Sequence, residues 1–432
     1  MVYIKTGITL SLAEKLKQIR IARGVTQEKL AEDIGYSAPM INHFENGRSE
    51  CKPNILMMIK KYLGLEGMPL LEPEREGFRD RLYIWLELIN NQQMDKAKEM
   101  QKKLHSITYL SFDEESNALY NLVRCRLLLA EGNIKEAKII LEDLETCLNE
   151  ADIEILYHYY YNRGTICYEN VQYREALDFY TKAFDYGRVE FREDSNIHFN
   201  IACCYLDLSL PYNSIESLEI ARSLNHGDGT NIIGLSIDIA LAVNYIRIGQ
   251  LKKAKNVVAK CYAKALSVGN KVFIGKALVS YGYLYRKAED WDLSIDYLNQ
   301  ALVYIPKDTI EYLDILYSKI RCYVRVKSFS QCTSLLAEGK KLAAANEYYT
   351  VLFKSLENLM TLNDNDSTEY LENVAIPFLL ARHQNFRVID FCDVLREHYK
   401  KREKGYLKKS LQLAAITNDV YKEMFEGGGF YG

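Results

Sequence analysis

The stretch "YHYYYNRGTICYENVQYREALDFYTKAFDYG" (residues 157–187) predicts the fold of most of the chain. It contains two amphipathic helical segments in succession. Gly164, Ala176 and Ala183 are small residues, and Tyr173 and Tyr180 are aromatic ones. Because small residues let two helices approach closely, this spacing predicts a helical hairpin.

The same pattern recurs along the chain at intervals of 38 to 40 residues. Two positions that keep their register through seven units indicate an internal repeat, in which each hairpin buries its apolar side only against its neighbours. The position in the first helix falls at Trp85, Cys125, Gly164, Ala202, Ala242, Gly282 and Ile320, and that in the second at Ala97, Ala137, Ala176, Ser214, Ala254, Ser294 and Cys332. After about residue 345 the pattern weakens, and helices are expected to continue through residues 348–362, 367–383 and 407–425 as two divergent units.

The repeat unit resembles a tetratricopeptide repeat, in which the first helix of each pair faces a concave groove. The resemblance implies groove-facing residues at fixed offsets in each unit. The candidates for binding a peptide are Arg126, Tyr161, Asn162, Glu169, Asn200, Asp207, Arg247, Tyr283, Arg286 and Arg321. The same offsets also give His158, Tyr168, Asn196, Phe199, Lys276, Lys287, Asp314, Tyr317 and Arg325.

Two kinds of groove residue suggest what the groove binds. Asn162 and Asn200 occupy the same place in successive units, and a carboxamide there can both donate to and accept from a peptide backbone. Arg247, Arg286 and Arg321 suit a carboxylate, either a free C-terminus or an acidic side chain. The alternative is that all of these are solvated groove residues with partners inside the protein.

The stretch "TQEKLAEDIGYSAPMINHFENGR" (residues 26–48) predicts a different module. Two short apolar-periodic runs are separated by Gly35-Tyr36, which is the spacing of two helices that meet at a tight turn. Thr26 and Ser37 are the expected N-caps, and Pro39 is tolerated in a first helical turn. The residues expected in the small core are Leu30, Ala31, Ile34, Ile41 and Phe44.

Residues 10–67 resemble the Xre/Cro family of phage-repressor-like DNA-binding domains, on the strength of Gln27, "LAEDIGYS" and "FENGR". The resemblance implies an internal ion pair between Arg20 and Glu45. It also implies phosphate contacts from Gln27, the main chain of Asn46 and Gly47, and Arg48. The expected DNA-binding residues are Gln27, Ser37, Ala38, Pro39, Asn42, His43, Asn46 and Arg48, with Asn42 and His43 as the polar base readers. The alternative is a helix-turn-helix used only for protein contacts.

A head of this kind followed by helical pairs resembles the RRNPP group of quorum-sensing regulators of Gram-positive bacteria and their phages. That resemblance implies a cytoplasmic transcriptional regulator that binds operator DNA as a homodimer and is switched by a short signalling peptide in the groove. An alternative within the group is a peptide-controlled modulator of a phosphorelay response regulator. A scaffold that clamps other proteins is a third possibility.

Composition excludes several other classes. Residues 1–68 hold ten Lys and Arg against seven Asp and Glu, so a weakly basic head precedes an acidic remainder. No apolar run is long enough to span a membrane, and the ten cysteines form no CxxC pair. No catalytic motif, metal-ligand spacing or cofactor-binding loop stands out, so we expect no enzyme activity, no metal and no cofactor.

The expected fold class is therefore all-α, with an N-terminal helix-turn-helix domain followed by a right-handed α-solenoid. The expected boundaries are residues 1–68 for the head, 69–77 for a linker, 78–345 for the repeats, 346–426 for the divergent helices and 427–432 for a flexible tail.

Overall fold

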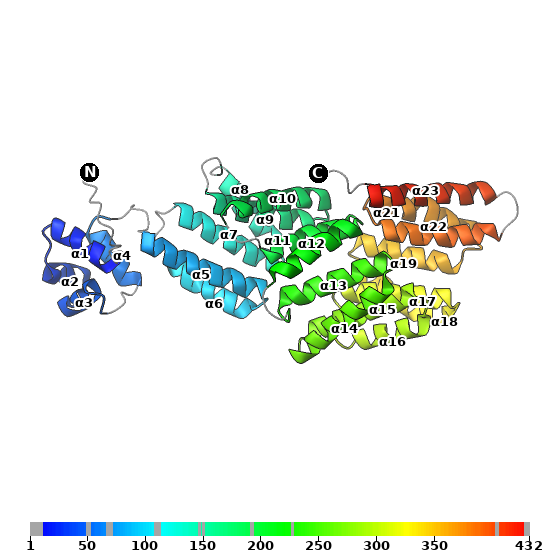
Figure 1. The fold of residues 1–432 in the computed structure, drawn as a ribbon, viewed down its shortest axis with the longest axis horizontal. Coiled ribbons are helices and arrows are strands. Elements are labelled where there is room, and N and C mark those ends of the chain that lie inside the picture. Colours follow the sequence, from blue (N-terminus) through cyan, green and yellow to red (C-terminus); the bar gives the residue numbers. More distant parts are fainter. Residues whose placement is uncertain are drawn as a thin grey trace. The chain divides into compact units, whose positions relative to one another are not determined.

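The computed structural model describes residues 12–48, 53–65, 72–107, 114–145, 148, 152–190, 194–225, 229–401 and 406–426. Within these ranges the chain forms helices joined by turns, with no strand, and no helix is long and apolar enough to cross a membrane. The helices are α1 (Leu12–Ala22), α2 (Gln27–Ile34), α3 (Ala38–Glu45), α4 (Pro53–Tyr62), α5 (Glu72–Asn90), α6 (Met94–Ile107), α7 (Glu114–Ala130), α8 (Ile134–Glu145), α9 (Ile153–Glu169), α10 (Tyr173–Glu190), α11 (Ser195–Asp207), α12 (Pro211–Leu224), α13 (Ile232–Arg247), α14 (Leu251–Ser267), α15 (Lys271–Lys287), α16 (Trp291–Ala301), α17 (Ile310–Arg325), α18 (Phe329–Leu342), α19 (Glu347–Met360), α20 (Asn365–Tyr370), the π-helical turn η2 (Leu371–Ala375), α21 (Ile376–Leu380), α22 (Asn385–Lys400) and α23 (Leu407–Glu426) (Figure 1).

The chain divides into two compact units, which are described separately. Unit 1 contains residues 1–166 and 185–190, and unit 2 contains residues 167–184 and 191–432. The head and the first repeats therefore belong to unit 1. The later repeats and the C-terminal helices belong to unit 2.

The head is a small bundle of α1–α4. Both ends of α2 form as the sequence predicts. The Thr26 hydroxyl accepts a hydrogen bond from the Lys29 amide at 3.1 Å, and α2 ends at Gly35 with φ +73°. Ser37 is the N-cap residue of α3, but its hydroxyl makes no capping bond, in contrast to the expected role. The core includes all five residues expected there, Leu30, Ala31, Ile34, Ile41 and Phe44.

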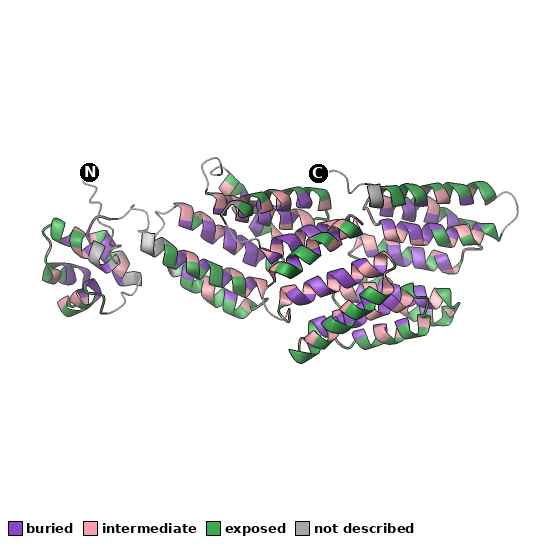
Figure 2. Ribbon diagram, viewed as in Figure 1, coloured by how far each residue is buried: buried purple, intermediate pink, exposed green. Residues whose placement is uncertain are grey.

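The repeat register predicted from the sequence is confirmed. All fourteen small or apolar register residues are buried, and the buried faces lie between helices while the outer faces are exposed (Figure 2). In the fourth and sixth units, a hydrogen bond also joins the two register positions. The Ser214 hydroxyl donates to the Ala202 carbonyl, and the Ser294 hydroxyl donates to the Gly282 carbonyl, both at 2.8 Å.

A feature that the sequence analysis missed is a shared turn within each hairpin. Seven residues after each first register position, the backbone takes a positive φ; these residues are Gln92, Gly132, Val171, Ser209, Gly249, Glu289 and Lys327. Five of the seven are not glycine, so no glycine pattern marks the turn in the sequence. The recurrence at one position indicates that the hairpin geometry, and not the local residue type, imposes the conformation.

Close helix approach at Gly282 gives a first prediction. A Cβ atom at this position would lie 2.6 Å from the Leu298 side chain. Gly282→Ala is therefore expected to destabilise the protein by about 1–3 kcal/mol through overpacking. The matched control is Gly77→Ala in α5, where a Cβ would meet nothing within 4 Å. Thermal unfolding of both variants checks the prediction, and equal melting temperatures would show that the close packing is not rigid.

The C-terminal region follows the three expected helical stretches and adds one more. α19, the segment α20–η2–α21 and α23 occupy the expected positions, whereas α22 (residues 385–400) was not anticipated. The helical segment α20–η2–α21 contains a π-helical turn just before Pro377, which has no N–H with which to continue the helical hydrogen bonds.

At the other end of the repeats, α5 begins at Glu72, inside the range expected as a linker. The expected tail, residues 427–432, lies outside the described residues.

Candidate functional site

The outer face of α3 is the candidate surface of the head. Pro39 and His43 are exposed, and Ala38 and Asn42 are half-buried. Ile41 and Phe44 point into the core from the same helix. The expected base readers Asn42 and His43 therefore lie on the outer side of the helix together with Ala38 and Pro39, and Arg48 beyond its end is also exposed.

A network of side-chain hydrogen bonds arranges the polar residues of this face. Asn42 Nδ2 donates to Gln27 Oε1 at 3.0 Å, and Asn46 Nδ2 donates to Asn42 Oδ1 at 3.1 Å. Lys17 Nζ donates to Asn46 Oδ1 at 2.9 Å. Three of the expected DNA-binding side chains, on Gln27, Asn42 and Asn46, are thus held together before any ligand binds.

A buried ion pair supports the network from below. Arg20 Nε and Nη2 donate to the two carboxylate oxygens of Glu45 at 2.6 and 2.8 Å, which confirms the pair expected from the family resemblance. The side chains are only 8% and 3% exposed. Arg20 Nη1 also donates to the Val25 carbonyl, and Gln27 Nε2 donates to Glu45, both at 2.5 Å. Glu45 therefore fixes α1, the loop after it and α2 relative to α3.

In unit 1, the predicted groove residues Arg126, Tyr161 and Asn162 form a buried cluster. Asn162 is 0% exposed; its Nδ2 donates to the Leu122 carbonyl at 2.8 Å, and its Oδ1 accepts from Arg126 Nε at 2.9 Å. The Arg126 guanidinium lies 3.4 Å from the centre of the Tyr161 ring. In this conformation the Asn162 carboxamide ties α7 to α9 and is not presented to a peptide.

Three of the predicted peptide-binding residues lie in or near the first helices of unit 2. Glu169 is exposed, and Asn200 and Asp207 are half-buried. The Tyr168 hydroxyl donates a hydrogen bond to the Asp207 carboxylate. Burial raises the pKa of Asp207, and the Tyr168 bond and the nearby Arg247 guanidinium offset part of that rise.

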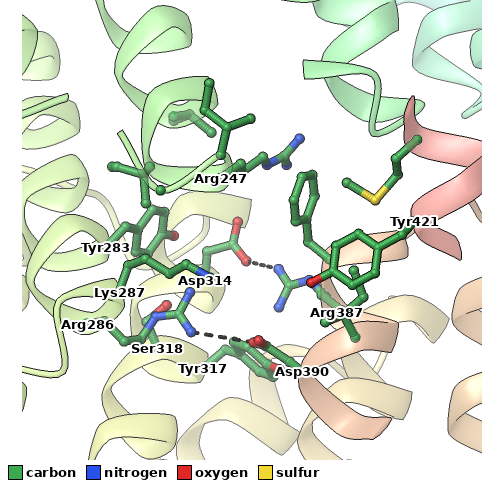
Figure 3. A pocket seen from close by; sticks show the side chains of 17 residues that line it. Arg247, Tyr283, Arg286, Lys287, Asp314, Tyr317, Ser318, Arg387, Asp390 and Tyr421 are labelled. Atoms are coloured by element: carbon green, nitrogen blue, oxygen red, sulfur yellow. Dashed lines mark hydrogen bonds and ion pairs between the residues drawn. The ribbon is translucent and has the colours of Figure 1, made fainter. Parts of the chain in front are cut away.

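The cationic residues of the later repeats meet at a cavity of about 450 Å³ in unit 2. It is lined by residues of α13, α15, α17, α22 and α23 (Figure 3). Of the predicted residues, Arg247, Tyr283 and Arg286 line it, whereas Arg321 does not. Figure 3 shows Asp314 and Arg387 facing each other across the middle of the cavity, with Arg286 facing Asp390 below them.

Helix α22 is joined to the groove-facing residues of α15 and α17 by ion pairs. Arg387 Nη2 donates to Asp314 Oδ1 at 2.9 Å, and Arg321 Nη2 donates to Asp390 Oδ2 at 3.2 Å. Arg286 Nη1 lies 3.7 Å from the same Asp390 oxygen. Burial opposes ionisation of Asp390, but Arg321 and Arg286 hold its pKa below the usual range. Arg321 therefore has an ion-pair partner inside the protein, as in the alternative considered for the groove residues.

The cavity residues that sequence reasoning missed lie mainly on α22 and α23. Arg387, Asp390 and Phe386 come from a helix beyond the clear repeats, where no register position identified them. Arg387 and Asp390 are three residues apart and so share one helix face, which was the one available local signal.

Comparison with known proteins supports both parts of the fold. A helix-turn-helix family profile matches residues 16–67. The chain is 20% identical over 386 residues to the transcriptional activator NprA of Geobacillus stearothermophilus, covering 85% of this chain and 93% of NprA.

The repeat fold is also similar to solved structures. NprR in complex with its cognate peptide NprX aligns with a TM-score of 0.63 at 19% identity, over 82% of this chain and 100% of that one. A Rap protein complexed with Competence and Sporulation Factor aligns with a TM-score of 0.71 at 16% identity, over 82% of this chain and 99% of that one. The chain therefore joins a helix-turn-helix head to a repeat fold like those of NprR and the Rap protein, which is the architecture expected from the resemblance of its sequence to the RRNPP group.

Proposed function

We propose that this protein is a transcriptional regulator that binds operator DNA as a homodimer and is controlled by a short peptide bound in its repeats. The observation that carries the proposal is the joint presence, in one chain, of a matched helix-turn-helix and a repeat fold similar to peptide-bound NprR. The NprA relative, named a transcriptional activator, aligns with most of the chain and supports the same role.

The head would bind DNA through the face of α3. Asn42 and His43 would contact base edges in the major groove, and Ala38 and Pro39 could touch thymine methyl groups. Gln27, Asn46 and Arg48 would contact phosphates, and Ser37 lies at the start of the helix that enters the groove. Because affinity rises with the number of phosphates neutralised, one weakly basic head would bind weakly. Two heads bound to paired half-sites would have a higher affinity than one, which is why we propose a dimer.

Peptide control would operate as a population shift. A peptide changes an equilibrium only if it binds one conformation of the repeats more tightly than another. In unit 2 the ion pairs between α22 and the helices α15 and α17 are a candidate for what the peptide alters, since they adjoin the cavity. A change in the repeats would then alter the separation of the two heads in the dimer, and with it their fit to fixed half-sites.

We propose that the protein acts by binding in the cytoplasm and not by catalysis. The similarity to a Rap protein is the reason to keep the alternative of a modulator of a phosphorelay response regulator. That similarity concerns the repeat fold alone. We favour DNA binding over binding of a response regulator because the outer face of α3 presents polar residues on a helix-turn-helix framework.

The DNA-reading face gives the test of this proposal. The double variant Asn42→Ala, His43→Ala is expected to lose discrimination between operator and scrambled duplex by about tenfold or more, because a good base contact contributes about 1–3 kcal/mol of discrimination. Nonspecific retention, which depends on phosphate contacts, should change much less. Competition binding at fixed salt measures both.

The control for this test is Gln18→Ala, an exposed residue on α1. It should leave discrimination unchanged. If the double variant still separates operator from scrambled DNA as well as the wild type does, α3 is not the reading helix.

A further inference from the structure

The cavity in unit 2 has the size of a site for one end of a peptide. Its volume of about 450 Å³ is near the lower end of the range for small-ligand pockets, about 300–1,000 Å³. All of its lining residues belong to unit 2. It can therefore accept a terminal residue, while the remainder of a peptide would have to lie outside it.

The charge of the lining favours an anion. Arg247, Arg286, Lys287 and Arg387 line the cavity together with only two carboxylates, those of Asp314 and Asp390. Both carboxylates already have cationic partners, Arg387 for the first and Arg321 and Arg286 for the second. Within the described part of the chain, Arg247 and Lys287 form no ion pair. Burial lowers the pKa of Arg247, so its charge is held in a site that solvates it poorly.

Two buried polar groups on the wall are also unsatisfied. The Tyr317 hydroxyl and Arg286 Nε have no hydrogen-bond partner within the described residues, and Tyr317 is only 3% exposed. Buried polar groups are nearly always hydrogen-bonded, since leaving one unpaired is costly. Both groups can donate, so an acceptor oxygen that enters the cavity and reaches them after a small movement of the side chains would satisfy them.

An apolar wall stands beside these donors. Ile246, Phe386, Ile389 and Met424 line the same cavity. A ligand that fits both walls carries an anionic oxygen group next to an apolar side chain. The C-terminal residue of a peptide has this combination when its side chain is apolar and its carboxylate is free.

We propose, building on the peptide-controlled function above, that this cavity binds the free C-terminal carboxylate of the signalling peptide, with Arg286 and Tyr317 as donors and an apolar last side chain against Phe386. Arg247 and Lys287 supply the remaining positive charge. The carboxylate competes with Asp390 for Arg286, so peptide binding weakens one of the contacts that hold α22 to α15.

The test uses synthetic pentapeptide pools, each fixed at its last residue and mixed elsewhere, made both as free acids and as C-terminal amides. Binding to the full-length protein is measured by the shift in melting temperature and by titration. Free-acid pools that end in an apolar residue are expected to bind at least about tenfold more tightly than the matching amides, as for the loss of one charge-assisted hydrogen bond.

Two variants connect this preference to the cavity. Arg286→Gln is expected to reduce the acid-over-amide preference about tenfold. Tyr317→Phe should weaken free-acid binding without lowering the melting temperature of the unliganded protein, because the hydroxyl has no partner to lose. The control is Lys307→Gln, whose side chain is 76% exposed, pairs with Glu338 and does not line the cavity; it should leave the preference unchanged.

Each outcome supports or overturns the assignment. Equal binding of acids and amides, with no effect of Arg286→Gln, overturns the subsite but leaves peptide control standing. Binding that instead follows Asp or Glu within the pools assigns the cavity to an acidic side chain and overturns the C-terminal claim. If no pool binds while the protein still selects its operator, both the subsite and peptide control fail and the DNA-binding role stands.

Discussion

Glu45→Ala is expected to destabilise the head by about 3–5 kcal/mol and to abolish specific DNA binding. Removing one partner of a buried ion pair has this cost, because the other charge is left without compensation. Here the stranded group would be Arg20, and the Glu45 carboxylate also accepts a hydrogen bond from Gln27. The change would release three segments of the head from α3.

Hydrogen exchange of head peptides in the full-length protein measures the effect without requiring two-state unfolding of the whole chain. Exchange in α1–α3 should accelerate strongly in Glu45→Ala, and the repeats should remain protected. The double variant Arg20→Met, Glu45→Leu should lose much less protection, since neither charge remains buried alone. The surface control Lys29→Ala removes an exposed pair with Asp33 and should leave exchange in the head unchanged. Equal exchange in Glu45→Ala and wild type would contradict the structural role of the pair.

Phe353→Ala is expected to lower the stability of unit 2 by about 3–5 kcal/mol. Phe353 on α19 is 0% exposed, and it occupies the space above Gly339 on α18, where a Cβ would meet the ring at 2.4 Å. The Phe353 ring therefore fills the space that a side chain at position 339 would occupy. Truncating the ring leaves a cavity between the last regular repeat and the divergent helices.

The same geometry predicts how substitutions at Gly339 and Phe353 combine in their effect on the free energy of unfolding. Gly339→Ala alone should destabilise the protein by about 1–3 kcal/mol, because the ring blocks the new methyl group. In the Phe353→Ala background the methyl group has room, so the double variant should be more stable than Phe353→Ala alone. Thermal unfolding of the four proteins gives the coupling energy. Additive losses would mean that the two residues do not share this space.

Much of the fold could be predicted because the repeat is encoded locally. Gly282 and Ser294 keep their register and also touch through a hydrogen bond, so spacing alone placed them in one hairpin. The Arg20–Glu45 pair was predictable for a different reason, since the head matches a compact family pattern. The shared positive φ of the turns was not predictable, because residues such as Val171 and Lys327 carry no preference for it.

The candidate site was predicted less completely. Arg247, Tyr283 and Arg286 were all expected at groove positions and line one cavity, whereas Asn162, also expected at a groove position, is buried. The sequence shows an asparagine at a groove position, and its burial depends on Arg126 and Leu122, about one repeat earlier. Asp314 and Arg387 are 73 residues apart, so no local spacing could reveal their pairing.

The most direct test of peptide-controlled operator binding is selection from a random duplex library by the full-length protein, with and without a bound free-acid peptide pool. We expect enriched sites with two inverted half-sites about 34–36 Å apart, or a multiple of that distance, whose retention changes when the peptide is added. A library with no enriched motif, or a single half-site retained equally in both conditions, would contradict it.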